Sequence, residues 1–193
     1  MDDVIARVEL PRRRFTVEDY HRMAEAGILH EADRVELIEG EIVEMSPIGH
    51  HHIASVLALS RRLTLAVGDR ALLSSQNPVR LSHDTEPEPD VVLLRPPESR
   101  YWQQAPRAED VLLLVEVADS SYRYDRDVKL PLYARAGIPE VWVVDIAGEA
   151  VEIHRQPGLR GYASAQRVER GATIAPAAFA DAVLAVADLL PPA

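Results

Sequence analysis

Cysteine is absent from the 193 residues, and this absence removes two kinds of structure at once. No disulfide can form and no thiolate can bind a metal, which fits a reducing compartment. The chain also has no apolar run near the ~20 residues that a membrane-spanning helix needs. Its first residues, Met1-Asp2-Asp3, are acidic, unlike those of a signal peptide, so the expected location is the cytoplasm.

Lysine is almost as rare as cysteine. Of the 21 basic residues, Lys129 is the single Lys and the other 20 are Arg. Arg is always charged and forked, whereas Lys is a compact ammonium whose pKa a protein can shift. Lys129 is therefore either a lysine left by a composition bias towards Arg, or a residue with a chemical role for which Arg is unsuited.

Basic residues are fewer than acidic ones, 21 against 31, so the formal net charge is −10. This charge argues against a protein that coats nucleic acid by bulk attraction, since phosphate binding usually produces a basic face. An enzyme acting on nucleic acid is still compatible with it. Acidic residues that gather around a cation lower the net charge, and the cation then supplies the local positive charge.

Length and an apolar share of 47% predict one globular domain at 15–193, preceded by an arm at 1–14. Periodicity predicts helices at 16–26, 51–67 and 130–136, and strands at 35–45 (two), 71–75, 79–81, 91–94, 111–118, 141–146 and 151–155. The last forty residues indicate two strands and a short helix near 185–190. This order predicts an α/β (α+β) domain with a mixed sheet flanked by helices.

Two details of the predicted helices can be tested directly. The apolar stripe of the helix at 51–67 contains Ile53, Val56, Leu57, Leu63 and Val67. In the later helix, Pro131 forbids a regular helix from 121 onward, which predicts a kink or a start near Asp127.

Glu116 is the sharpest chemical signal, because it interrupts an apolar strand expected to be buried on both faces. A carboxylate there costs several kcal/mol unless it is paired or binds a metal. A structural ion pair with an Arg is the alternative.

Asp90 opens the strand at 91–94. If that strand pairs with the one carrying Glu116, the two carboxylates can converge, and a divalent cation would relieve their repulsion. Lys129 follows thirteen residues after Glu116, on a helix that can return over the sheet. Its ammonium could orient a water and stabilise charge on a phosphate, although most lysines simply lie on solvated helix faces.

The sequence resembles the Uma-two family, described as putative restriction endonucleases, within the PD-(D/E)XK nuclease superfamily. The resemblance is carried by residues 36–42, Met45-Ser46-Pro47, His51, 87–90, 116–121, 124–126, 129–130, 133–134 and 137–145. It implies a restriction-endonuclease-like core of order αβββαβ. It also implies that Asp90 and Glu116 bind the metal, that Lys129 is the catalytic lysine, and that Glu36 adds a further carboxylate.

The chain departs from the superfamily pattern at Ala118, where the lysine is expected. The family places that lysine on the following helix, as Lys129 does here. Three consecutive histidines, His50-His51-His52, cannot close on one ion, because neighbouring helical residues point about 100° apart. His51 matches the family's histidine, and capping of the helix is the favoured interpretation for it.

The predicted function is a metal-dependent DNA endonuclease that uses Mg²⁺ or Mn²⁺. Asp90, Glu116 and the Val117 carbonyl would hold the cation, and Lys129 would position the nucleophile. A homodimer would let two sites act on two strands. The alternative is a catalytically inactive nuclease-fold module that binds nucleic acid or a protein partner. A small-molecule hydrolase is disfavoured, because no Gly-x-Ser-x-Gly elbow or phosphate-binding Gly loop is present.

Overall fold

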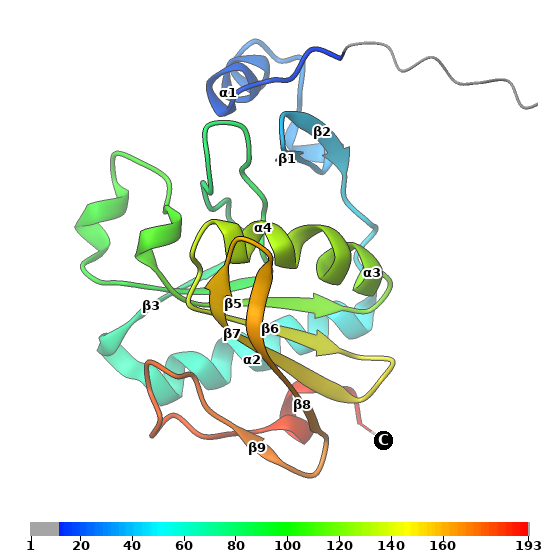
Figure 1. Ribbon diagram of the computed structural model, residues 1–193, viewed down its shortest axis with the longest axis vertical. Coiled ribbons are helices and arrows are strands. Elements are labelled where there is room, and N and C mark those ends of the chain that lie inside the picture. The colour runs from blue at the N-terminus through cyan, green and yellow to red at the C-terminus, as the bar shows by residue number, and fades with distance from the viewer. Residues whose placement is uncertain (1–11, 193) are drawn as a thin grey trace, which may run out of the picture.

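A six-stranded mixed sheet forms the centre of the computed structural model, which describes residues 12–192 (Figure 1). The helices are α1 (Val17–Glu25), α2 (His50–Val67), α3 (Tyr122–Tyr124) and α4 (Leu130–Arg135), with a π-helical turn at Asp125–Lys129 between the last two. The strands are β1 (Val35–Ile38), β2 (Glu41–Glu44), β3 (Leu72–Ser75), β4 (Val91–Leu94), β5 (Val111–Ala118), β6 (Glu140–Asp145), β7 (Ala150–Gly158), β8 (Gly161–Glu169), β9 (Thr173–Ile174) and β10 (Leu184–Ala185).

The strand order β3-β4-β5-β6-β7-β8 follows the chain, and all neighbours are antiparallel except β5 and β6. A parallel pair needs a crossover, and here α3, the π-helical turn and α4 supply it. Reading α2, β3, β4, β5, α3–α4 and β6 in sequence gives the order αβββαβ. The predicted fold class is therefore confirmed.

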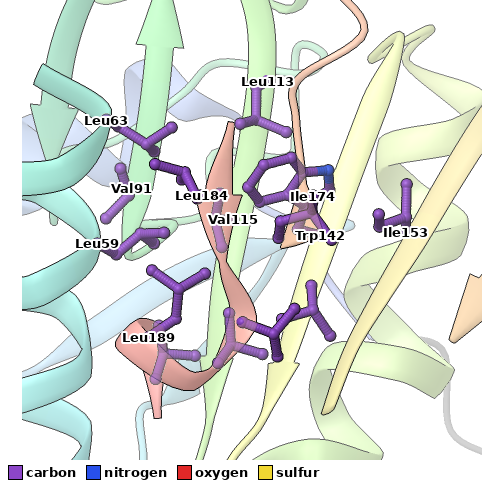
Figure 2. Packing of buried hydrophobic residues seen from close by; sticks show 14 of the residues in the cluster. Leu59, Leu63, Val91, Leu113, Val115, Trp142, Ile153, Ile174, Leu184 and Leu189 are labelled. Atoms are coloured by element: carbon purple, nitrogen blue, oxygen red, sulfur yellow. The ribbon is translucent and has the colours of Figure 1, made fainter. Parts of the chain in front are cut away.

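Both faces of the sheet are covered, and alternation along β5 decides which side chain meets which layer. Leu113, Val115 and Val117 belong to the core beneath α2, which the C-terminal segment completes (Figure 2). Leu114 belongs to the core beneath α4, and Glu116, two positions on, points to the same face. The alternation along β5 thus places the carboxylate of Glu116 in the layer that contains Lys129.

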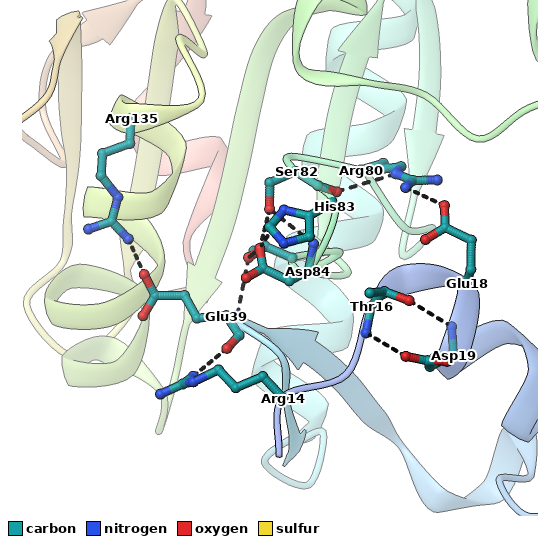
Figure 3. Close-up of polar contacts among 11 residues, drawn as sticks. Arg14, Thr16, Glu18, Asp19, Glu39, Arg80, Ser82, His83, Asp84 and Arg135 are labelled. Atoms are coloured by element: carbon teal, nitrogen blue, oxygen red, sulfur yellow. Dashed lines mark hydrogen bonds and ion pairs between the residues drawn. The ribbon is translucent and has the colours of Figure 1, made fainter. Parts of the chain in front are cut away.

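The β1–β2 hairpin and α1 lie outside the main sheet, and polar contacts fix them to α4 and to the loop before β4 (Figure 3). Thr16 caps α1 in a reciprocal arrangement with Asp19. Glu18 of α1 pairs with Arg80, and Glu39 in the hairpin turn pairs with Arg135 of α4. These contacts hold the hairpin above the end of the sheet where β4 begins.

Gly40 is required in the hairpin turn for two reasons. Its φ is +77°, and a Cβ at this position would lie 2.6 Å from Cβ of Arg14. The N-terminal segment can therefore pass close to the turn only because residue 40 has no side chain.

The sequence locates most elements within three residues, and its predictions are wrong on three points. The strand expected at 79–81 is absent: its amide groups bond to loop carbonyls, among them those of Pro87, Pro106 and Thr85. Ile53 and Leu57 are 48% and 65% exposed, so they lie outside the buried stripe of α2. The last forty residues contain three strands, not two, and their helix is a 3₁₀ turn at Val186–Leu189.

Residues 1–11 of the arm predicted at 1–14 lie outside the described residues. Among the helices of residues 12–192, none has the length and apolar character needed to cross a membrane.

Candidate functional site

A cavity of about 900 Å³ lies between the β1–β2 hairpin and the end of the sheet where β5 stops and β4 begins. Its walls come from α1, the hairpin, the loop before α2, the first turn of α2, and the segment from β5 through the π-helical turn. The predicted site residues Glu36, Asp90, Glu116 and Lys129 all line it. Side chains far apart in sequence therefore share one cavity.

Asp90 and Glu116 are adjacent because β4 and β5 pair antiparallel, with Val91 opposite Val115. Oδ2 of Asp90 accepts a 2.8 Å hydrogen bond from the Val117 amide. The Asp90 amide in turn lies 3.4 Å from Oε2 of Glu116. The main chain of each strand thus holds the carboxylate of the other.

Lys129 lies between two buried carboxylates. Its Nζ is 3.2 Å from Oε2 of Glu36 and 3.3 Å from Oε1 of Glu116, and its side chain is 5% exposed. The alternative of a lysine on a solvated helix face is therefore wrong. The buried partner of Glu116 is also this lysine and not an Arg.

The π-helical turn brings Tyr124 and Lys129 to the same face, where both contact Glu36. In a regular α-helix, Tyr124 and Lys129 would point about 140° apart, because five residues advance 500° around the axis. In the wider turn the Leu130 amide bonds to the carbonyl of Asp125, five residues back. Pro131 has no N–H for an α-helical bond to Asp127, so its predicted disruption takes the form of this wide turn.

Two tyrosines from this helical segment each hold one carboxylate of the site. The hydroxyl of Tyr124 donates to Oε1 of Glu36 at 2.9 Å. The hydroxyl of Tyr133 donates to Oε1 of Glu116 at 2.5 Å. The Glu88 amide also donates to Oε2 of Glu36, at 3.1 Å.

His52, in the first turn of α2, reaches the site from the opposite layer. Its Nδ1 lies 2.9 Å from the carbonyl oxygen of Val117, and its Nε2 lies 2.9 Å from Oδ1 of Asp90. His51, the histidine selected from the family resemblance, is exposed, and its ring packs against His50. The histidine that enters the site is therefore the residue after His51, and the helix cap favoured for His51 is wrong, because no side chain of residues 12–192 caps α2.

Three buried carboxyl groups, those of Glu36, Glu116 and Asp125, share the ammonium of Lys129. Burial raises the pKa of Glu116, and Lys129 offsets this only in part. Burial likewise raises the pKa of Asp125 to about 6, despite the same lysine. Burial alone would lower the pKa of Lys129, but Glu116, Glu36 and Asp125 together raise it. The site therefore keeps its ammonium and has room for more positive charge.

A divalent metal suits the chemistry of these donors. Asp90 and Glu116 offer hard carboxylate oxygens, and the Val117 carbonyl is adjacent in the chain. Within residues 12–192, no three histidine or carboxylate side chains surround one point that could hold a metal ion. A cation here would accordingly take few protein ligands and keep several waters, as Mg²⁺ commonly does.

Four residues near the centre escaped the sequence analysis: His52, Tyr124, Asp125 and Tyr133. His52 could have been found, because it lies four residues before Val56 and seven before Leu59, on the buried face of α2. The tyrosines and Asp125 lie in segments that carry the family resemblance, 124–126 and 133–134, but the resemblance gives them no role. Their direction depends on the π-helical turn, which the local sequence does not specify.

The chain matches the family model named Uma2, described as "Putative restriction endonuclease", over residues 17–187. It is also similar in fold to a crystal structure of a putative nuclease belonging to DUF820 from Anabaena variabilis ATCC 29413. That likeness has a TM-score of 0.68 and 17% sequence identity, and it covers 91% of this chain and 97% of the other. None of the curated proteins matches the chain.

Proposed function

This chain belongs to the Uma2 family of putative restriction endonucleases, and we propose that it is a metal-dependent endonuclease that hydrolyses phosphodiester bonds of DNA. One observation carries the proposal. Asp90, Glu116 and Lys129, singled out from the sequence for this chemistry, line the same cavity, with Lys129 3.3 Å from Glu116. A buried acid–ammonium pair beside a second carboxylate is the arrangement that metal-assisted phosphodiester hydrolysis uses.

The proposed cation is Mg²⁺ or Mn²⁺, with Asp90 and Glu116 as ligands and the Val117 carbonyl as a third candidate. When bound, such a cation offsets the negative charge of the carboxylates and of the phosphate that must approach them. Burial raises the pKa of Glu116 and of Asp125, so a cation would favour the charged forms of both carboxyl groups.

Lys129 would act on the reacting phosphate. Its ammonium can donate to a phosphate oxygen or to the attacking water, and the Glu36 carboxylate keeps it aimed into the cavity. Water supplies the new bond to phosphorus, one ester P–O bond breaks, and the leaving oxygen takes up a proton. The products are a phosphate monoester and a hydroxyl end. Glu36 would then serve as a positioning residue for Lys129.

The test uses the whole chain with labelled single-stranded and duplex DNA and with supercoiled plasmid, each with Mg²⁺ or Mn²⁺. We expect cleavage that a chelator abolishes. Glu116→Gln should reduce it by more than about 100-fold while the fold is retained. Glu152→Gln is the matched control, because this carboxylate pairs with Arg167 outside the cavity.

Two outcomes would count against the proposal. Unchanged cleavage by Glu116→Gln would remove Glu116 from the site. A wild-type protein that neither binds Mn²⁺ nor cuts any of these DNAs would favour the non-catalytic binding module. Homodimerisation, with two sites for two strands, stays a prediction that light scattering can test.

A further inference from the structure

The imidazole of His52 has one ring nitrogen satisfied and one that is not. Nδ1 lies 2.9 Å from the Val117 carbonyl, which can only accept, so Nδ1 carries the proton and donates. Nε2 is buried from solvent and makes no hydrogen bond within residues 12–192. A buried polar atom without a partner is uncommon in a folded protein and calls for an explanation.

The position of Nε2 in His52 explains why this atom has no hydrogen-bond partner. It lies 2.9 Å from Oδ1 of Asp90, at hydrogen-bond distance although the contact lacks hydrogen-bond geometry. Asp90 raises the pKa of His52. In the neutral ring, with its proton on Nδ1, the lone pair of Nε2 and the carboxylate oxygen face the same small space. Two electron-rich atoms so placed are both suited to bind one positive ion.

The contact of the other ring nitrogen, Nδ1, is typical of a metal-binding histidine. Such histidines almost always donate their other N–H to a carbonyl or a carboxylate, which fixes the tautomer and the ring orientation. Val117 provides that carbonyl from β5. His52 itself is anchored in the first turn of α2, whose buried face packs on the sheet.

We propose that Nε2 of His52 and Oδ1 of Asp90 together bind the divalent cation of this site, an inference that rests on the proposed function. The two ring nitrogens point in different directions, so a cation on Nε2 lies away from the Val117 carbonyl. That carbonyl then orients the histidine instead of binding the metal. A nitrogen ligand also favours Mn²⁺ over Mg²⁺, because a divalent transition-metal ion accepts imidazole more readily than Mg²⁺ does.

The inference predicts a loss of metal affinity when the imidazole is removed. Calorimetric titration of the whole chain with Mn²⁺ should show binding weakened about 10- to 100-fold in His52→Ala, with a smaller change for Mg²⁺. His52→Asn is the second variant, because its amide can still donate to Val117 but offers no imidazole nitrogen. It should bind Mn²⁺ as weakly as His52→Ala does.

His51→Ala is the matched control, since its side chain is exposed on the same helix. Electron spin-echo spectroscopy of bound Mn²⁺ gives a readout independent of cleavage. Protein labelled with ¹⁵N-histidine should show coupling of Mn²⁺ to a histidine nitrogen. The coupling should persist in His51→Ala and disappear in both His52 variants.

The outcomes separate the two proposals. If the wild type binds Mn²⁺ and cuts DNA, but shows no nitrogen coupling and equal affinity in the His52 variants, the inference is overturned and the nuclease stands. Tighter Mn²⁺ binding in His52→Ala would show that the histidine competes with the cation, and would also overturn it. If the wild type binds no Mn²⁺ and cuts nothing, both proposals fail.

Discussion

The hydroxyl of Tyr133 donates a 2.5 Å hydrogen bond to Oε1 of Glu116, and both side chains are buried. Tyr133→Phe removes this donor without changing the shape of the core. A hydrogen bond to a charged group contributes about 1.5–3 kcal/mol, so the free energy of unfolding should fall by about that amount. Glu116 would also be less well oriented, and the dissociation constant for Mn²⁺ should rise roughly tenfold.

A second tyrosine provides the control for this experiment. Tyr162 donates to the carbonyl of Ile138, a neutral acceptor away from the cavity. Tyr162→Phe should cost about 1 kcal/mol of stability and leave Mn²⁺ binding unchanged. If the two variants bind Mn²⁺ equally well, Tyr133 has a structural role only.

Replacing Lys129 should separate stability from catalysis. Lys129→Met leaves Glu36 and Glu116 buried without their shared ammonium, which should cost about 3–5 kcal/mol of unfolding free energy. Urea denaturation measures this cost. Because Lys129 is not a proposed ligand, the variant should still bind Mn²⁺ while cleavage is lost.

The double variant Lys129→Met with Glu36→Gln checks the cause of that instability. It removes one of the two uncompensated charges, so its stability should exceed that of Lys129→Met alone. Such non-additivity is expected for residues in one network. A double variant that is further destabilised would show that packing of the lysine stem, and not charge, explains the loss.

The sequence is informative about the fold where hydrophobic periodicity is strong. The apolar run of β5 and the stripe of α2 predict buried elements, and the single carboxylate in β5 indicates a site. The long edge strand β8 escapes prediction because most of its side chains are polar or small and exposed. Such a strand is defined by its pairing with β7, which is a tertiary property.

In the candidate site, too, the sequence identifies some residues and misses others. Asp90, Glu116 and Lys129 can be named from the chain because each breaks a local pattern. His52 is missed because the three consecutive histidines are chemically identical, although its spacing from Val56 and Leu59 places it on the buried face of α2. Tyr124 and Tyr133 are missed because the π-helical turn changes the angular spacing on which helical patterns depend.

Glu140 is a buried carboxylate outside the cavity, and removing its cationic partner should lower stability without affecting the site. It accepts hydrogen bonds from Arg155 at 2.7 Å, from Trp142 at 2.7 Å and from the Ala177 amide at 2.6 Å. Arg155→Met removes its cationic partner and should cost about 3 kcal/mol. Thermal and urea unfolding measure the loss.

The comparison for Arg155→Met is Arg160→Met, an exposed position in the β7–β8 turn. That change should alter stability by less than about 0.5 kcal/mol. Both variants should bind Mn²⁺ like the wild type, because neither residue lines the cavity. Equal stability of the two variants would mean that Glu140 gains nothing from Arg155.

His154 on β7 predicts a pH dependence of stability that is independent of the metal site. Burial lowers its pKa, although Glu152, with Oε2 3.4 Å away, opposes the shift. In the unfolded chain a histidine titrates near about pH 6.5. Below that pH the unfolded state binds a proton that the folded state resists, so this group lowers stability as the pH falls, by at most about 1.4 kcal/mol per pH unit.

His154→Gln removes this contribution. Between about pH 7.5 and about pH 5.5, the unfolding free energy of the wild type should fall more than that of the variant. His51→Gln, on the exposed face of α2, should behave like the wild type. If His154→Gln loses stability as steeply as the wild type, His154 takes up its proton equally in both states, and the ion pair with Glu152 balances the cost of burial.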